Sequence, residues 1–329
     1  MNRIVILDGY VVNPGDNPWD GLAGLGDLTV FDRTSSDKIV ERGKNADIIL
    51  TNKTALHAET LAQLKNLRFI SVLATGYDNV DIAAAGMLGI PVANVPEYGT
   101  DSVAQHTMAL LLELCNRVGE HVAAVNRGDW TRSPDFSFWK VPLMELAGKK
   151  LGIIGFGRIG QRVGEIASAF GMKILAFNPH NRGFQATFPV TWMELRELFA
   201  EADVVSLHCP LTAENSEFVN KDLLSVMKKS AFLVNTARGR LIREEDLARA
   251  LEKGSIGGAA LDVVSREPIA ADNPLLSAPN CLITPHNAWA TLDARRRLTA
   301  TAVKNVEAFL QGRRINIVNS RFLSSPGGC

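Results

Sequence analysis

The chain has 329 residues, enough for about two domains, and its 46% apolar and 21% charged residues exclude a disordered or fibrous protein. Its 35 basic and 35 acidic residues give a net charge of zero, and no basic block is present. We therefore expect no nucleic-acid partner and no association with an anionic membrane. No apolar run approaches the roughly 18 residues that a membrane helix needs.

The four cysteines are widely separated in the sequence, and no two of them form a C-x-x-C pair. This spacing predicts free thiols in a reducing compartment. They are Cys115, Cys209, Cys281 and Cys329. The first eight residues read directly as a strand and leave no room for a signal peptide. We therefore expect a cytoplasmic protein.

Short apolar runs alternate with amphipathic stretches in the first third, a pattern typical of a parallel sheet covered by helices. The predicted strands are 3–8, 28–31, 47–51, 68–73 and 91–94, and the predicted helices between them are 60–65 and 81–88. One long helix is predicted over 101–127, because apolar residues recur there at helical spacing. The aromatic segment 128–139 is expected to pack on another surface, such as a second subunit.

The alternation restarts near residue 149. Its predicted strands are 151–154, 173–177, 203–207, 231–235, 258–263 and 281–284, and a final helix is predicted over 291–311. Because this series begins with its own glycine turn, we expect a nucleotide-binding domain over 101–287. The remaining pieces, 1–100 and 288–329, would form a second, discontinuous domain.

The glycine turn lies between the strand at 151–154 and a helix predicted over 161–170. It has the pattern G-x-G-x-x-G, in which each glycine has a mechanical role. Gly155 permits the tight turn, Gly157 lets the backbone approach a pyrophosphate, and Gly160 lets the helix pack closely on the strand. The helix N-terminus then offers free N–H groups to the phosphates. The sequence therefore predicts a dinucleotide site.

The next strand bears on the choice of dinucleotide. It is followed by Asn178, which can hydrogen-bond a ribose but lacks the carboxylate that would repel a 2′-phosphate. His180 and Arg182 could bind such a phosphate, or could be ordinary solvated loop residues. The residues therefore leave NAD(H) and NADP(H) both open.

Three polar residues follow later strands: Arg238, Glu267 and His286. The carboxyl ends of strands in a doubly wound sheet meet at one crevice, so these side chains could meet in space. A guanidinium can bind the carboxylate of a 2-oxo acid, and an imidazolium can protonate its carbonyl as hydride arrives. A carboxylate beside the imidazole would stabilise its protonated form. Each residue could also have a purely structural role.

Several spaced motifs resemble those of the D-isomer-specific 2-hydroxyacid dehydrogenases, and together they span about residues 1–319. The motifs are 75–81, 102–104, 155–160, 205–212, 235–240, 260–263 with 267–268, and 284–286. This resemblance implies an α/β fold with two doubly wound parallel-sheet domains, a Rossmann nucleotide domain and a flavodoxin-like substrate domain. It also implies a homodimer joined through the nucleotide domains, and the hydride chemistry needs no metal.

The resemblance also implies site residues. Arg238 would bind substrate, Glu267 would pair with His286, and His286 would be the acid/base. Substrate contacts would come from Ala74, Thr75, Gly76, Arg238 and Trp289. Cofactor contacts would come from Thr75, Gly155, Gly157, Arg158, Ile159, Gly160, Asn178, His208, Cys209, Pro210, Thr236, Ala237, Asp262 and His286.

Within the family, the chain is most similar to glycerate dehydrogenases, also called hydroxypyruvate reductases, through segments 7–10, 13–16, 73–77, 133–136 and 285–289. This similarity implies reduction of hydroxypyruvate and glyoxylate. Two alternatives remain: a reductase of bulkier 2-oxo acids, and a nucleotide-sensing protein without activity, like the corepressors of the superfamily.

Five further residues bear on these expectations. Trp289 could limit the size of the substrate pocket or be an ordinary core residue, and His208 is expected to pack beside the cofactor. We expect His106 and His121 at a surface or an interface. Gln105 stands where many relatives carry Glu, and no functional consequence follows from it.

Overall fold

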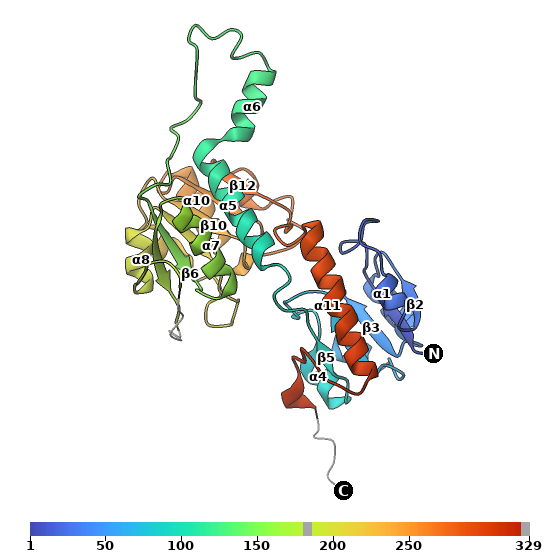
Figure 1. Ribbon diagram of the computed structural model, residues 1–329. Helices are drawn as coiled ribbons and strands as arrows, with labels where there is room; N and C mark the ends of the chain where they lie inside the picture. Colours follow the sequence, from blue (N-terminus) through green and yellow to red (C-terminus); the bar gives the residue numbers. More distant parts are fainter. Residues whose placement is uncertain (180–185, 324–329) are drawn as a thin grey trace. The chain divides into compact units, whose positions relative to one another are not determined.

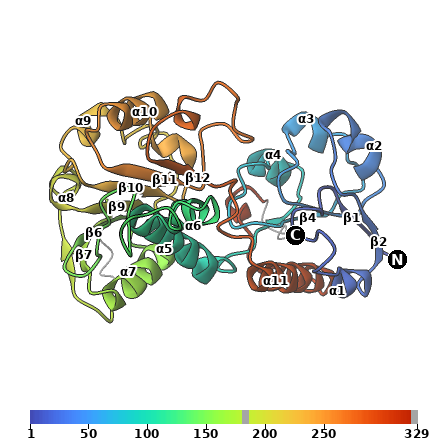
Figure 2. The same cartoon turned by 90° about the horizontal axis from the view of Figure 1, so that it is seen from above.

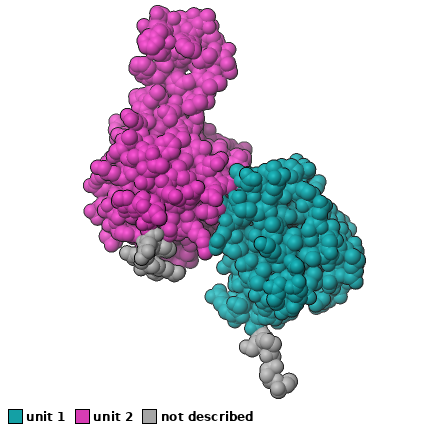
Figure 3. All heavy atoms as spheres, in the orientation of Figure 1, with its two compact units in different colours: residues 1–99, 290–329 teal, residues 100–289 magenta. Residues whose placement is uncertain are grey.

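The computed structural model describes residues 1–179 and 186–323, and the chain divides into two compact units (Figures 1 and 3). The first unit comprises residues 1–99 and 290–329, and the second comprises residues 100–289. These boundaries lie one or two residues from those expected for the two domains.

The first unit is built on a five-stranded parallel sheet of order β2-β1-β3-β4-β5. Its strands are β1 (Arg3–Ile6), β2 (Asp27–Val30), β3 (Ile48–Thr51), β4 (Phe69–Val72) and β5 (Val92–Ala93). This order is that of flavodoxin-like sheets, whose direction of winding changes between the first and third strands. The expected doubly wound fold of this unit is confirmed.

Helices cover both faces of this sheet (Figure 2). One face carries α1 (Asp20–Ala23) and α11 (Leu292–Leu310), and the other carries α2 (Ile39–Gly43), α3 (Ala58–Leu61) and α4 (Ile82–Met87). Two short 3-10 helices, η1 (Ser36–Lys38) and η4 (Ser320–Phe322), complete the unit. Phe69 of β4 stacks on Phe309 of α11 with ring centroids 4.5 Å apart, so the last helix of the chain is packed against the first sheet.

The second unit contains a seven-stranded parallel sheet of order β12-β11-β10-β9-β6-β7-β8. Its strands are β6 (Lys150–Ile154), β7 (Lys173–Phe177), β8 (Val190–Trp192), β9 (Val204–Leu207), β10 (Phe232–Asn235), β11 (Gly258–Leu261) and β12 (Cys281–Ile283). Counted from β6, this is the Rossmann order 3-2-1-4-5-6 with one strand added. The direction of winding changes between β6 and β9, which is where such sheets bind ligands.

Two cores bury the two faces of this sheet. Successive strand residues point to opposite faces, so Val204 and Val205 of β9 belong to different cores. The helices are α5 (Thr100–Asn116), α6 (Val118–Asn126), α7 (Arg158–Ala169), α8 (Leu195–Glu201), α9 (Lys221–Leu224) and α10 (Glu244–Glu252), with the 3-10 helices η2 (Gly239–Leu241) and η3 (Pro274–Leu276). Helices α5 and α7 cover one face, and α8, α9 and α10 cover the other (Figure 2).

Every predicted strand is present, with ends that differ by at most two residues. The edge strand β8 was not predicted. The single helix predicted over 101–127 is wrong, because the chain breaks at Arg117 into α5 and α6. Arg117 has a left-handed φ of 49° and donates a hydrogen bond to Asn280 Oδ1 at 2.8 Å. In the part of the chain that the structure describes, no helix is long and apolar enough to cross a membrane.

Candidate active site

The glycine turn joins β6 to α7 at the point where the winding of the sheet reverses. Gly155 has a φ of 92°, and a Cβ there would lie 2.6 Å from the backbone N of Cys209. A Cβ on Gly160 would lie 2.3 Å from the carbonyl oxygen of Gly155. Gly157, the N-cap of α7, is exposed and would have nothing within 4 Å of a Cβ. Two glycines are therefore required by close packing, while the third leaves the open backbone that a pyrophosphate needs.

The residues around this turn come from three neighbouring strands. Arg158 and Ile159 begin α7, and Asn178 follows β7, whose last carbonyl, on Phe177, accepts a hydrogen bond from Gly155 N–H. His208, Cys209 and Pro210 follow β9, and His208 N–H donates to Ile154. These side chains therefore share the carboxyl edge of the sheet. The predicted His180 and Arg182 lie outside the described residues.

Burial changes the chemistry of two groups at this edge. It lowers the pKa of His208 to about 3, so the ring is neutral at pH 7, and a 2.8 Å hydrogen bond joins its Nε2 to Ser206 Oγ. Burial also raises the pKa of the Cys209 thiol to about 11. Both groups therefore present uncharged surfaces beside the glycine turn.

The loop after β10 carries Arg238. Asn235 shapes this loop, because its side chain donates to the Arg238 carbonyl at 2.8 Å and accepts from Ala237 N–H at 2.9 Å. Thr236 is hydrogen-bonded through Oγ1 to Thr107 on α5 at 2.9 Å. The Arg238 guanidinium donates to the Ala237 carbonyl at 2.8 Å.

The loop after β10 lies against the loop after β11 because residue 239 is a glycine. A Cβ on Gly239 would lie 1.9 Å from the carbonyl carbon of Val264, so only glycine permits the approach. Val264 N–H in turn donates to Glu267 Oε1 at 3.3 Å. The loops that carry Arg238 and Glu267 are therefore packed against each other.

Glu267 and His286 form a direct pair. His286 Nδ1 lies 2.6 Å from Glu267 Oε2, and the two side chains are 26% and 36% exposed. Because a carboxylate only accepts hydrogen bonds, the imidazole proton of this bond is on Nδ1. The other ring nitrogen, Nε2, is then the atom that can exchange a proton with a substrate.

Asp262 is buried beneath the segment that carries His286. Its Oδ1 accepts from Thr284 Oγ1 at 2.6 Å and from Asn287 N–H at 3.0 Å, and its Oδ2 accepts from Ala288 N–H at 2.9 Å. Both carboxylate oxygens are therefore used to hold the chain on either side of His286.

His106 of α5 is 24% exposed, and its Nε2 lies 3.1 Å from Thr284 Oγ1 and 3.5 Å from Asp262 Oδ1. Its ring therefore contacts the segment that carries His286, and its expected position at a surface or an interface stays a prediction. Helical periodicity could place His106 on one face of α5 but could not reveal what that face contacts. Trp289 is half-buried and donates from its indole N–H to the His286 carbonyl at 2.9 Å.

In the first unit, Ala74, Thr75 and Gly76 follow β4. Ala74 accepts from Val95 N–H at 3.0 Å, Thr75 Oγ1 donates to the Val95 carbonyl at 2.9 Å, and Asn94 donates to the Thr75 carbonyl at 2.8 Å. Among the described residues, none accepts a hydrogen bond from the backbone N–H groups of 74–76. The loop is held by its carbonyls and side chain, which leaves its N–H groups available.

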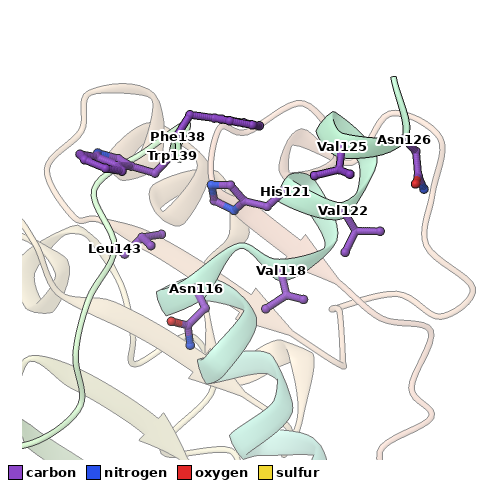
Figure 4. A pocket seen from close by; sticks show the side chains of 9 residues that line it. All are labelled: Asn116, Val118, His121, Val122, Val125, Asn126, Phe138, Trp139 and Leu143. Atoms are coloured by element: carbon purple, nitrogen blue, oxygen red, sulfur yellow. The ribbon is translucent and has the colours of Figure 1, made fainter. Parts of the chain in front are cut away.

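An apolar groove of about 430 Å³ lies between α6 and the segment that returns from it (Figure 4). His121 connects the two walls, since its Nδ1 bonds the Arg117 carbonyl at 2.8 Å and its Nε2 accepts from Lys140 N–H at 3.2 Å. The groove is lined by Asn116, Val118, His121, Val122, Val125, Asn126, Phe138, Trp139 and Leu143. None of these residues is among the predicted site residues. In the described part of the chain, no cluster of three or more His, Cys, Asp or Glu side chains could hold a metal ion.

Comparison with known proteins places this geometry in a family. Residues 108–288 match the NAD-binding domain of the D-isomer-specific 2-hydroxyacid dehydrogenases. A hydroxypyruvate reductase of Blautia hydrogenotrophica is 49% identical over 96% of this chain and 99% of its own length. A glycerate dehydrogenase of Methylorubrum extorquens is 41% identical over 86% of this chain and 89% of its own.

A solved structure extends the likeness to nearly the whole chain. The NADPH-dependent glyoxylate/hydroxypyruvate reductase of Sinorhizobium meliloti, determined with citrate, is 27% identical. It superposes with a TM-score of 0.82 over 97% of this chain and 98% of that one. The chain belongs to the D-isomer-specific 2-hydroxyacid dehydrogenases and is an oxidoreductase that uses NAD(H) or NADP(H).

Proposed function

We propose that this chain reduces hydroxypyruvate and glyoxylate with NADH or NADPH and, in the reverse direction, oxidises D-glycerate. The observation that supports this most directly is the 2.6 Å pair of His286 and Glu267, on the same sheet edge as the glycine turn. The names of the relatives, hydroxypyruvate reductase and glycerate dehydrogenase, support the choice of substrate.

Three side chains carry the proposed reaction. Arg238 binds the substrate carboxylate and polarises the neighbouring carbonyl. When bound, a reduced nicotinamide would supply the hydride that the carbonyl carbon accepts. His286 gives its Nε2 proton to the carbonyl oxygen, so the carbonyl group becomes an alcohol and His286 becomes neutral. Glu267 accepts the hydrogen bond from Nδ1 and so fixes the orientation of the imidazole.

We further propose that the second unit binds the dinucleotide. The open backbone at Gly157 and the N-terminal end of α7 would hold the pyrophosphate, together with Arg158 and Ile159. Asn178 would contact the adenosine ribose. The loops that contain His208, Cys209 and Pro210, and Thr236, Ala237 and Asp262, would line the rest of the cofactor.

In the same proposal the first unit binds substrate. The available N–H groups of Ala74, Thr75 and Gly76 suit a carboxylate, because successive backbone N–H groups form an anion-binding concavity. Trp289 would border the substrate pocket, and Thr75 would also contact the cofactor.

We also propose a homodimer in which a second copy covers the groove of Figure 4. The residues around it include exposed apolar side chains, among them Phe136 at 90%, Trp139 at 67% and Val118 at 56% exposure. Apolar surface of this kind marks protein interfaces. V122E should convert the dimer to monomer in light-scattering measurements, while a wild-type monomer would contradict this part of the proposal.

We place the protein in the cytoplasm, because Cys115, Cys209 and Cys281 are free thiols, as expected in a reducing compartment.

The test of the proposed function is the loss of reduced-nicotinamide absorbance with hydroxypyruvate, glyoxylate and phenylpyruvate, each with NADH and NADPH. We expect hydroxypyruvate to have the highest kcat/KM, and the ratio between the two cofactors to assign the preference. Faster reduction of phenylpyruvate would contradict the proposed substrate. Cofactor binding without turnover of any 2-oxo acid would indicate a nucleotide sensor.

A further inference from the structure

The backbone of His286 has a conformation that a residue with a side chain seldom adopts. Its φ is 52°, in the left-handed region, which is unfavourable for a non-glycine residue. The Glu267 bond orients the imidazole, but it does not hold the main chain. Other contacts must keep the acid/base segment, residues 284–289, in this conformation.

One set of contacts to this segment is made by Asp262. His286 N–H donates to the Asp262 carbonyl at 2.8 Å, while the Asp262 carboxylate accepts from Asn287 and Ala288 N–H. Asp262 therefore binds three consecutive backbone N–H groups. The position of its carboxylate decides where the peptide that follows His286 lies.

His106 fixes that carboxylate through Thr284. Because a carboxylate only accepts, the Thr284 hydroxyl must donate its proton to Asp262 Oδ1, at 2.6 Å. Thr284 Oγ1 can then only accept from His106 Nε2, at 3.1 Å, so that nitrogen carries a proton. The hydrogen bonds run in one direction, from His106 through Thr284 to Asp262. This series of hydrogen bonds begins on α5. The same helix also binds the acid/base segment through Ser102 Oγ, which donates to the Ala288 carbonyl at 2.6 Å.

A second contact comes from Trp289. Its indole N–H donates to the His286 carbonyl at 2.9 Å, so the peptide groups on both sides of the His286 Cα are hydrogen-bonded. A phenylalanine at this position would keep an aromatic ring but lose this donor. The two possible roles of Trp289, limiting the pocket and holding His286, can therefore be separated.

We propose that His106 and Trp289 are positioning residues that hold the acid/base segment, His106 through Thr284 and Asp262, and Trp289 through the His286 carbonyl. This inference rests on the proposed function, in which His286 is the acid/base. Neither residue exchanges a proton with the substrate. Each acts by keeping His286 Nε2 where the substrate carbonyl is reduced.

The first test compares H106L and H106Q, with H57L as the control for loss of an exposed histidine. Leucine removes the donor, whereas the glutamine amide can donate from nearly the position of Nε2. We expect kcat for hydroxypyruvate to fall at least about tenfold in H106L, and to return to within about threefold of wild type in H106Q. The Kd for NADH and the thermal midpoint should change little in H106Q, and H57L should behave as wild type.

The second test follows the segment without turnover. In the protein without ligand, hydrogen exchange at the Asn287 and Ala288 amides should be at least about tenfold faster in H106L than in wild type. In W289F, kcat should fall by a similar factor for glyoxylate and hydroxypyruvate, because a misplaced acid slows both. A change in KM that depends on substrate size, with kcat unchanged, would assign Trp289 to the pocket wall alone and overturn its part of the proposal.

The outcomes separate this inference from the proposed function. Wild-type protein without activity would refute the function, while the exchange rates would still test the positioning. An active wild type whose H106L variant keeps kcat and amide exchange within about twofold would refute the inference alone. If H106L does not fold, H106N, whose shorter side chain cannot reach Thr284, and W289F give the same comparison.

Discussion

His208 should make the protein less stable in mild acid. Burial lowers the pKa of this residue to about 3 in the folded protein, whereas an unfolded histidine has a pKa of about 6.5. Between these values the unfolded chain binds a proton that the folded chain does not, so the free energy of unfolding falls as the pH falls below about 6.5. Protonation of His208 in the unfolded chain lowers the free energy of unfolding by about 0.1 kcal/mol at pH 7.5 and by about 2 kcal/mol at pH 5.0. Any folded-state pKa below about 4 gives the same result at pH 5.0.

The assay compares wild type with H208N, whose side chain does not titrate, by urea unfolding followed through tryptophan fluorescence. Four of the five tryptophans, Trp130, Trp139, Trp192 and Trp289, belong to the second unit, so the signal reports the unit that contains His208. The stability difference between the two proteins should shift by about 2 kcal/mol in favour of H208N from pH 7.5 to 5.0. All other groups titrate alike in both proteins. A difference that stays constant within about 0.5 kcal/mol would show that His208 is protonated at pH 5.0 in the folded protein as well, which contradicts the lowered pKa.

Three other substitutions test the site. E267Q removes a charge-assisted hydrogen bond worth about 1.5–3 kcal/mol, so kcat should fall ten- to a hundredfold while NADH binding measured by fluorescence is unchanged; wild-type kcat would contradict the role of Glu267. G160A places a Cβ 2.3 Å from the Gly155 carbonyl and should lower both the thermal midpoint and the affinity for NADH, and an unchanged Kd would argue against this turn as the pyrophosphate site. D262N leaves a buried N–H without an acceptor and should lower the free energy of unfolding by about 1–3 kcal/mol, whereas unaltered stability would show that the bonds to Asn287 and Ala288 contribute little.

The periodicity of the sequence predicted most of the fold, because strands buried on both faces are nearly continuous apolar runs. Strand β8 was not predicted, because it is three residues long and lies at the sheet edge, where little of it is buried. The interruption of the helix at Arg117 was not predicted, because the helical spacing of apolar residues continues through Val118 and Val122 into α6. Those valines are exposed in the structure, which periodicity alone could not show.

The candidate site was predictable to the extent that strand ends identify loops. Arg238, Glu267 and His286 each follow a strand, and the sheet order brings their loops to one edge. The hydrogen-bond network that holds these loops was not predictable. It depends on the directions of side chains on α5 and in the loops after β10, β11 and β12. His106 is the clearest case: its partners, Thr284 and Asp262, are more than 150 residues away in the chain.

The assignment of His286 as the acid/base is tested by the activity of H286Q toward hydroxypyruvate, measured together with the affinity of the variant for NADH. Loss of a general acid costs about a hundred- to ten-thousandfold in rate, and we expect a fall of that size with the NADH Kd within about twofold of wild type. A variant that keeps turnover within about tenfold of wild type would contradict the assignment of His286 as the acid/base.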